Sequence, residues 1–505
     1  MLPISEPDIK ERIERDNPWW SNPQESILEA EFPRRVYFSP LRTLALAFDV
    51  RRATILLGPR RVGKTVIIKQ LISEAMAAGV NPRSILYASI DAPIYSGIPL
   101  EKFISLMPTD ANGKRLVIFD EIQYLKNWEV HMKDLVDNYP NIKFVATGSA
   151  AAALRLKSRE SGAGRFSEFM LPPLTFYEFL KFTKEDDALI EVTEEGQRKR
   201  YSARDINELN TRFIDYLNFG GYPEAVLNKA VRQNADQFIR NDIIDKVLLK
   251  DLPSLYGINE IQQLNKLFSF LAYNSGNKAS LENIAQESGL AKPTIKRYIE
   301  YLESAFLIIK LSTVDENCRS MKRERNFKVY LNNPSMRAAL FAPVKADDAD
   351  KIGHLAESAI FSQWQHAAAF RQLRYARWRN VGEVDIVYLS SPDQRPHWIG
   401  EIKWSDRIKD HFGEETGAIQ TLLAHHKSIN AVIFTTKTHS GEVTIEDRQM
   451  RIMPSSLYCY TVGRNITSRL DRAAFPTVSQ EDDDDEDRGS EEQETEDEDS
   501  AIEER

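Results

Sequence analysis

The sequence predicts a multidomain α/β protein in which a parallel-sheet nucleotide-binding core is followed by further units. Three observations predict this fold class. Apolar strand-like runs alternate with helical patterns between residues 55 and 149, and a glycine-rich loop opens the first of these helices. The chain of 505 residues is long enough for roughly two to four domains with sizeable cores. Strands that are apolar throughout favour a parallel sheet covered by helices on both faces.

The glycine-rich loop has the sequence of a phosphate-binding P-loop. It follows an apolar run and matches G-x-x-x-x-G-K-[ST] in a strand–loop–helix setting. The glycines let backbone N–H groups turn inward, and the new helix adds its positive end. The pattern predicts ATP and Mg²⁺ as ligands, with Lys64 at the β- and γ-phosphates and Thr65 on the metal. The expected nucleotide-binding residues are Gly58, Pro59, Arg60, Arg61, Val62, Gly63, Lys64 and Thr65.

Two further strand ends carry polar residues that an ATP site needs. One apolar strand ends in Asp120 and Glu121. We expect Asp120 to hold Mg²⁺ through water and Glu121 to act as the catalytic group that orients the attacking water. The strand predicted at 141–149 ends in Thr147 and Ser149, and either hydroxyl would sense the γ-phosphate. All these residues follow the carboxyl ends of strands, which is where ligands bind in parallel sheets.

Two features after the core have open interpretations. Arg165 follows a glycine-rich segment. Its spacing fits a phosphate sensor or an arginine finger as well as it fits a surface arginine in a turn. The run Gly220-Gly221-Tyr222-Pro223 interrupts a helical pattern. It is either a hinge that transmits nucleotide state or a plain turn between domains.

The middle of the chain carries a helix-turn-helix pattern, at 281–290 and from Lys292 onward, with a proline in the second helix's first turn. Strand-like runs at 306–311 and 327–331 are expected to be the wing strands of a winged helix. This unit either contacts DNA phosphates or is a packing module whose basic face is only solvated. The basic residues concerned are Lys292, Lys296, Arg297, Arg319, Lys322, Arg323 and Arg325.

The last candidate site combines three carboxylates and a lysine. Glu357 lies in a helical stretch, Asp385 lies inside an alternating strand, and Glu401 and Lys403 follow on the next strand, two positions apart. Alternation along that strand would put Glu401 and Lys403 on one face. Asp385 and Glu401 supply hard oxygen ligands for Mg²⁺. Lys403 would activate water or stabilise phosphate charge, with Glu357 assisting the metal.

This order of residues resembles the Glu…Asp…Glu-x-Lys site of the PD-(D/E)xK nucleases. On that resemblance the four residues are catalytic, with Asp385 and Glu401 as metal ligands. The alternative is a nuclease-like fold that has lost hydrolysis and keeps these charges as a salt-bridge network, because a fold does not establish an activity.

The motifs together resemble one family of prokaryotic AAA-type ATPases, whose members carry a C-terminal domain of formerly unknown function that resembles restriction endonucleases. The resemblance spans roughly residues 35–440 and implies that Arg165 is an arginine sensor. The segments that carry it are Gly58–Thr65, Phe119-Asp120-Glu121-Ile122-Gln123, Thr147-Gly148-Ser149, Gly164-Arg165, Pro173-Leu174-Thr175-Phe176, Phe219-Gly220-Gly221-Tyr222-Pro223 and Leu249-Lys250-Asp251-Leu252.

Composition limits the partners and the compartment. The formal charge of the chain is −9, and residues 481–505 alone contribute −14, so the rest is mildly basic at +5 and permits nucleic-acid binding. The acidic tail is expected to be disordered, and it either solubilises the chain or competes for basic surfaces. The chain has no apolar run of membrane-spanning length, and its two cysteines lie far apart, which favours a cytoplasmic protein.

The predicted units are an N-terminal lead-in (1–34), an AAA-type core (35–200), a helical and winged-helix domain (201–335), a PD-(D/E)xK-like α/β domain (336–476) and a disordered acidic tail (477–505). The expected function is ATP binding and hydrolysis that control a DNA-binding module with a candidate Mg²⁺-dependent nuclease site. The alternative is a nucleotide-dependent switch or protein-interaction ATPase with an inactive nuclease-like domain. Expected partners are DNA, further copies of the chain and a protein partner, with no membrane.

Overall fold

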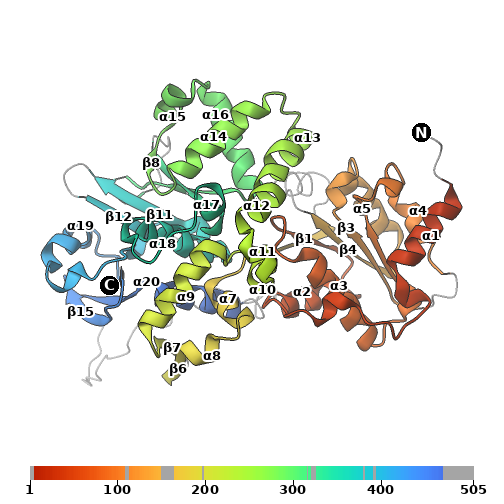
Figure 1. Ribbon diagram of the computed structural model, residues 1–505, viewed down its shortest axis with the longest axis horizontal. Helices are drawn as coiled ribbons and strands as arrows, with labels where there is room; N and C mark the ends of the chain where they lie inside the picture. Colours follow the sequence, from red (N-terminus) through yellow and green to blue (C-terminus); the bar gives the residue numbers. More distant parts are fainter. Residues whose placement is uncertain are drawn as a thin grey trace, which may run out of the picture.

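The computed structural model describes residues 5–108, 113–148, 164–195, 198–315, 317–319, 326–378, 382–390 and 394–469. Two large sheets lie at opposite ends of the molecule, and helices of the middle region lie between them (Figure 1). No helix in the described ranges has the length and apolar character needed to cross a membrane. The predicted acidic tail, Ser149 and the basic residues 322–325 fall outside the described residues.

The N-terminal sheet confirms the predicted parallel α/β core. Its five strands are all parallel, in the order β2-β3-β4-β1-β5. The strand order places the P-loop strand β1 between β4 and β5. The strands are β1 (Ala53–Leu57), β2 (Ile85–Ser89), β3 (Arg115–Asp120), β4 (Ile142–Gly148) and β5 (Phe166–Met170), and the helices are α2 (Phe38–Ala45), α3 (Lys64–Ala77), α4 (Leu100–Ser105) and α5 (Trp128–Asn138).

Strand β5 was not among the strands predicted from the sequence. It is an edge strand that pairs only with β1 in the described structure, and none of its five residues is fully buried. An edge strand of this kind does not need the continuous apolar run that marks the inner strands. The sequence signal that identified the other strands was therefore absent here.

The lead-in closes the opposite edge of the same sheet. Helix α1 (Glu6–Asp16) ends at Asn17, whose side chain accepts from the N–H of Tyr87 at 2.6 Å and donates to its carbonyl at 2.8 Å. The indoles of Trp19 and Trp20 both donate to the carbonyl of Ile85. These side chains satisfy edge groups of β2 that would otherwise be free to pair with another chain.

The middle region begins with helices that pack against both ends of the molecule. Its double glycine is a close-packing point. A Cβ on Gly221 would lie 2.3 Å from the side-chain oxygen of Asn333. The elements are α7 (Phe176–Phe182), α8 (Asp186–Leu189), the hairpin β6 (Ile190–Glu195) and β7 (Arg198–Ala203), α9 (Ile206–Phe219), α10 (Pro223–Leu227), α11 (Lys229–Gln233), α12 (Ala235–Ile239), α13 (Leu252–Tyr256) and α14 (Ile261–Tyr273).

Between α12 and α13 the helix continues as two π-helical segments, Arg240–Asp245 and Val247–Asp251. Here we call them the π segments. π-Helical turns are rare and are often found at functional sites.

The rest of the middle region is a helix pair beside a small sheet of order β8-β10-β9. Helix α15 ends at Gly289, whose φ of +73° suits a left-handed C-cap, and Pro293 lies in the first turn of α16. The winged-helix interpretation stays a prediction. The elements are β8 (Lys278–Ala279), α15 (Leu281–Ser288), α16 (Lys292–Ser304), β9 (Ile308–Ser312), β10 (Phe327–Leu331) and α17 (Ser335–Leu340).

The C-terminal sheet has six strands in the order β11-β12-β13-β14-β16-β15. The first three are antiparallel, whereas β13, β14 and β16 are parallel to one another. Helices α18 and α20 contribute to the core on one face and α19 to the core on the other. The elements are α18 (Ala349–Trp364), β11 (Leu373–Trp378), β12 (Gly382–Leu389), β13 (Pro396–Glu401), α19 (Phe412–His425), β14 (Ala431–Thr436), β15 (Gly441–Ile445), β16 (Arg448–Pro454) and α20 (Ser455–Ser468).

The units share their hydrophobic cores. One core joins side chains of α7 and α9 to side chains of α18 and α20, and it also includes residues of β9 and β10. The other large core runs from the N-terminal sheet into α14, α16 and β10. Strand β10 therefore takes part in both cores, which fixes the middle region against the C-terminal sheet.

Candidate functional site

The P-loop glycines are required by the local backbone. A Cβ on Gly58 would lie 2.2 Å from the carbonyl oxygen of Leu171, at the end of β5. Gly63 has a φ of +95° immediately before α3 begins. Close approach at the first position and left-handed backbone at the second are both conformations that only glycine adopts at low cost. The loop is thereby held at the N-terminus of α3.

The polar side chains of Lys64 and Thr65 lie at the N-terminus of this helix. Lys64 is 5% exposed, and its ammonium donates to the carbonyls of Gly58 at 3.1 Å and Pro59 at 2.8 Å. Burial lowers the pKa of Lys64. The hydroxyl of Thr65 donates to Asp120 at 2.8 Å. The P-loop and the end of β3 therefore meet, as the sequence predicted.

The acidic pair at the end of β3 is oriented by a hydroxyl of β4. Asp120 accepts hydrogen bonds from Thr147, Thr65 and Tyr87, the last at 2.9 Å. Glu121 has left-handed backbone, and its N–H donates to the hydroxyl of Thr147 at 3.1 Å. Thr147 thus positions both acidic residues.

A cavity of about 910 Å³ opens beside the P-loop, which is within the range of about 300–1,000 Å³ common for ligand sites. Arg60, Arg61, Lys64, Thr65 and Glu121 line its polar part. Its apolar lining was missed by the sequence analysis, because it comes from the lead-in, α3, α7 and α10. Those residues include Phe32, Val66, Phe182 and Leu227. A ligand with a charged end and a flat apolar end suits this lining.

The two P-loop arginines reach the π segments. Arg60 makes two hydrogen bonds to Asp251, at 2.7 and 2.8 Å. Although burial opposes it, the hydrogen bond and charge of Asp251 raise the pKa of Arg60. Arg61 pairs with Glu224 at 3.2 Å and with Asp242 at 3.0 Å. The phosphate-binding loop is therefore tied to the helical middle region by charge pairs that a bound phosphate would compete for.

Arg165 lies at the other end of β1 from the P-loop. Its carbonyl accepts from the N–H of Ala53, the first residue of β1, whereas the P-loop follows the last residue of β1. Its guanidinium pairs with Asp137 at 2.7 Å. A five-residue strand spans about 16 Å. Arg165 therefore lies at the amino-terminal ends of the parallel strands, whereas the phosphate site lies at their carboxyl ends. This position gives no support to the predicted sensor role on its own chain, and action on a second copy stays a prediction.

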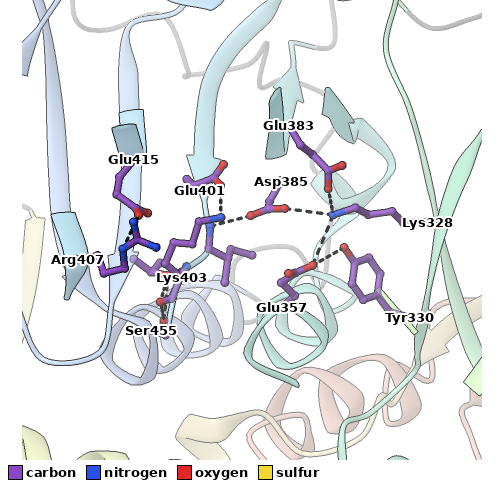
Figure 2. A network of polar contacts seen from close by, with 12 residues as sticks. Lys328, Tyr330, Glu357, Glu383, Asp385, Glu401, Lys403, Arg407, Glu415 and Ser455 are labelled. Atoms are coloured by element: carbon purple, nitrogen blue, oxygen red, sulfur yellow. Dashed lines mark hydrogen bonds and ion pairs between the residues drawn. The ribbon is translucent and has the colours of Figure 1, made fainter. Parts of the chain in front are cut away.

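The four residues of the second candidate site come together at one end of the C-terminal sheet (Figure 2). Glu357 lies on α18 and Asp385 on β12, while Glu401 is the last residue of β13. The ammonium of Lys403 pairs with Glu401 at 2.5 Å. Lys403 lies two positions beyond the last residue of β13, and its side chain lies beside that of Glu401, as the sequence predicted.

The backbone after β13 is also tied into this centre. The N–H of Ile402 donates to Asp385 at 3.0 Å, and the N–H of Lys403 donates to the hydroxyl of Thr435 at 2.9 Å. Thr435 lies on β14 and accepts from the segment that follows β13, so β12, β14 and this segment fix the positions of the charged groups together.

Sequence reasoning missed two members of the centre, Lys328 and its partner Glu383. Lys328 on β10 is 3% exposed and lies among three carboxylates. Its ammonium is 3.2 Å from Asp385 and 3.6 Å from Glu357, and it also pairs with Glu383 (Figure 2). No motif marks this lysine, since its neighbours in the sequence are apolar strand residues.

The charges in the centre shift the acidities of its carboxyl groups. Burial, reinforced by the charge of Asp385, raises the pKa of Glu357 to about 7 and that of Glu401 to about 8. For Asp385 burial is outweighed by Lys328 and Lys403, which lower its pKa. For the two glutamates, burial and the charge of Asp385 outweigh the neighbouring lysines.

The residues present fit one hard cation at the Glu401 side. The Oε2 atom of Glu401 is buried and has no hydrogen-bond partner among the described residues, and carboxylate oxygens suit Mg²⁺. Within the described ranges no three His, Cys, Asp or Glu side chains are grouped to share one ion. Asp385 and Glu401 are the pair left available for a metal.

The basic residues of the helix pair are partly exposed. Lys296 and Arg297 are exposed on α16, whereas Lys292 pairs with Glu282 at 2.7 Å. Arg319 is also exposed. Lys322, Arg323 and Arg325 lie outside the described residues, so the predicted basic surface is seen only in part.

Comparison with known proteins finds two family matches. Residues 50–180 match an AAA domain, and residues 210–348 match a domain of unknown function, DUF8612. The first match covers β1 to β5 and the P-loop, so the chain contains a P-loop ATPase domain of AAA type, which supports ATP binding and ATPase function. The second match covers the middle region, whereas the predicted domain of unknown function was the C-terminal one.

Similar proteins include uncharacterized protein MJ1544 of Methanocaldococcus jannaschii, which is 25% identical over 418 residues covering 81% of this chain and 88% of that protein. An uncharacterized protein of Haemophilus influenzae is 24% identical over 60% of this chain and 72% of its own length. Among solved structures, Cdc6p from Pyrobaculum aerophilum is 14% identical and matches 61% of this chain and 94% of its own, with a TM-score of 0.27.

Proposed function

We propose that this protein is an ATP-hydrolysing switch whose nucleotide state controls a PD-(D/E)xK-like module that acts on DNA. The observation that carries the proposal is the convergence of Asp385, Glu401 and Lys403 at one end of a sheet that shares its core with elements touching the nucleotide cavity. Two chemically complete sites in one packed molecule favour coupling over independent action.

At the first site the residues divide the work of phosphoryl transfer. Lys64 and Arg60 would neutralise the phosphates, and Thr65 with Asp120 would hold Mg²⁺. The metal supplies charge neutralisation at the phosphates when it is bound. Glu121 would orient the attacking water from the position that Thr147 fixes. Phe32 and Leu227 would cover the base at the apolar end of the cavity.

At the second site Asp385 and Glu401 would hold a divalent cation, which supplies Lewis-acid activation when bound. Lys403, paired with Glu401, would stand beside the reacting phosphate and stabilise its negative charge. Glu357 reaches the same centre from the preceding helix, as the PD-(D/E)xK resemblance expects. Exposed Lys296 and Arg297 on α16 would contact the DNA backbone.

The first test is DNA cleavage by the purified full chain. Single-stranded, duplex and branched DNA would be incubated with Mg²⁺ or Mn²⁺, with and without ATP, beside Lys403→Ala and the control Lys409→Ala. We expect Lys403→Ala to lower cutting about 100-fold, because it removes a charge aimed at the reacting group. Lys409 is half exposed and lies on the following turn, so its removal should leave cutting unchanged.

Cutting that survives Lys403→Ala would reject the assigned site. Cutting that is lost in the mutant, and that changes with ATP in the wild type, supports both the nuclease and its control. The same experiment with Lys64→Ala separates an effect of bound ATP from an effect of free nucleotide.

The second candidate function is a nucleotide-dependent switch with an inactive nuclease-like module. It is favoured by the ion pairs of Lys328 with Glu357 and Asp385, which offset part of the negative charge of the centre without any metal. In this case wild type cuts no DNA although ATP turnover is intact. Salt-dependent DNA binding in a gel shift then separates a DNA-binding switch from a protein-interaction ATPase.

The ion pair between the P-loop and the π segments leads to a prediction about ATP affinity. We expect Asp251→Asn to tighten ATP binding about tenfold, because Arg60 no longer has to break a charged pair with the π segments before it reaches a phosphate. Titration of a fluorescent ATP analogue measures the affinity.

The matched control for this prediction is Asp245→Asn, on the same stretch of helix. Asp245 is partly exposed and pairs with Arg240 at 4.0 Å, so its substitution should leave the affinity within error of wild type. An unchanged affinity in Asp251→Asn as well would mean that Arg60 does not move on nucleotide binding.

A further inference from the structure

Lys328 is a buried lysine of the middle region that lies in the charged centre of the C-terminal sheet. It lies on β10 of the middle sheet, and its ammonium contacts carboxylates of α18 and β12. It also lies 5.5 Å from the ring centre of Tyr375 on β11. A lysine buried to this degree is rare unless it is paired, and here three carboxylates surround it (Figure 2).

The strand that carries Lys328 is anchored on both sides. Its neighbours Phe327, Val329 and Leu331 belong to the core that continues into the N-terminal sheet. Tyr330 belongs to the C-terminal core, and its hydroxyl donates to Glu357 at 3.0 Å. These contacts hold the backbone of Lys328 in place, and the ion pairs with three carboxylates hold its ammonium in the centre.

The other side of the same centre is arranged differently. Lys403 is bonded to Oε1 of Glu401, while the buried Oε2 has no partner among the described residues. One oxygen of Asp385 faces Lys328, and the other accepts from the backbone N–H of Ile402. Each side of the centre thus contains one lysine, and at the Glu401 side one carboxylate oxygen, Oε2, is left without a partner among the described residues.

We propose that Lys328 is a built-in cation of the C-terminal centre, which restricts that centre to a single divalent ion at Asp385 and Glu401. This inference rests on the proposed metal centre and assigns Lys328 as a positioning residue. The middle region then completes the site, because it supplies a charge that a second metal ion supplies in two-metal hydrolases.

Electrostatics supports this assignment. Three carboxylates lie within ion-pair distance of the buried Lys328 ammonium. An ammonium 3.2 Å from Asp385 repels a second divalent ion at close range and weakens binding of the first.

The experiment counts Mn²⁺ ions bound by the full chain without nucleotide, by titration calorimetry and by the electron paramagnetic resonance of free Mn²⁺. Wild type should bind one ion and Asp385→Asn none. Lys328→Met should bind Mn²⁺ about tenfold more tightly or take up a second ion. Lys328→Arg, which keeps the charge, should bind one ion with an affinity close to that of wild type.

The control variant is Lys278→Met. Lys278 lies directly opposite Lys328 in the pairing of β8 with β10 but is exposed, so its removal should change neither number nor affinity. Wild type without Mn²⁺ binding, or Lys328→Met with wild-type number and affinity, would overturn the proposal.

A second measurement needs no variant and so does not depend on Lys328→Met folding. Hydrogen exchange of the wild-type amides in β10 should stay unchanged when Mn²⁺ saturates the centre, because Lys328 remains in place. Faster exchange in β10 would mean that the metal displaces Lys328, which contradicts a built-in cation. Ion binding is scored without DNA, so failure to cut DNA would reject the nuclease function and leave this result standing.

Discussion

Glu178→Gln is expected to lower the free energy of unfolding by about 3–5 kcal/mol, because it leaves a buried arginine charge without its counter-ion. Glu178 is fully buried, and it pairs with Arg35, which is 5% exposed, at 2.6 and 2.9 Å. Arg35 also donates to the carbonyls of Val62 in the P-loop and Pro172 before α7. Glutamine keeps the size of the side chain and its capping acceptor, so the lost charge dominates the effect.

The matched control is Glu74→Gln on α3. Glu74 pairs with Arg34 and Arg42, each at 3.0 Å, but both arginines are more than 40% exposed. Exposed pairs contribute about 0–1 kcal/mol, so this variant should stay within that range of wild type. Urea unfolding followed by tryptophan fluorescence measures both. If both variants lost the same small amount of unfolding free energy, the introduced glutamine and solvent would be compensating the charge of Arg35.

The same pair lies on a polar route between the two sites. Glu178 completes a capping box with Thr175 at the start of α7. The next N–H, of Phe176, donates at 2.9 Å to Gln363 on α18, the helix that carries Glu357. Tyr37, two residues after Arg35, also bonds to His366 just beyond α18. These hydrogen bonds connect the P-loop at Val62 with the helix that carries Glu357, and the proposed coupling between the two sites would use them.

The sequence was most informative where chemistry is encoded by local spacing. Lys64, Thr65, Asp120 and Glu121 could be assigned because strand–loop–helix motifs fix their positions within a few residues. Their meeting in space follows from parallel-strand topology alone. Asp385, Glu401 and Lys403 could be named for a similar reason, because their order and spacing along neighbouring strands are local.

Residues that depend on distant pairing could not be found this way. Arg35 lies 143 positions from Glu178, and Lys328 lies 57 positions from Asp385. Neither spacing is a motif, and a lysine between apolar strand residues gives no sign that it is buried. Arg165 shows the opposite case. A glycine-rich approach suggested a sensor, but β5 begins at the amino-terminal ends of the parallel strands, away from the P-loop.

Glu121→Gln is expected to lower ATP hydrolysis by about 10²–10⁴-fold while ATP binding stays close to wild type. The carboxylate lines the cavity beside Lys64 and Thr65, and its backbone is fixed by the bond to Thr147. A positioned group that accepts a proton from the attacking water contributes a factor of this size, and glutamine cannot accept that proton. The metal-holding contacts lie on Asp120 and Thr65, so binding does not depend on Glu121.

Phosphate release at saturating ATP measures turnover, and a fluorescent ATP analogue measures affinity in the same preparation. Glu74→Gln, on the α3 helix but absent from the cavity lining, is the control for both and should match wild type. Wild-type turnover in Glu121→Gln would assign water orientation to another group. Loss of binding along with turnover would instead make Glu121 a structural residue, since its left-handed backbone turns the chain from β3 toward α5. If turnover is lost and binding is kept, the variant holds ATP without hydrolysing it, and DNA cleavage in that state shows whether bound ATP or its hydrolysis controls the C-terminal centre.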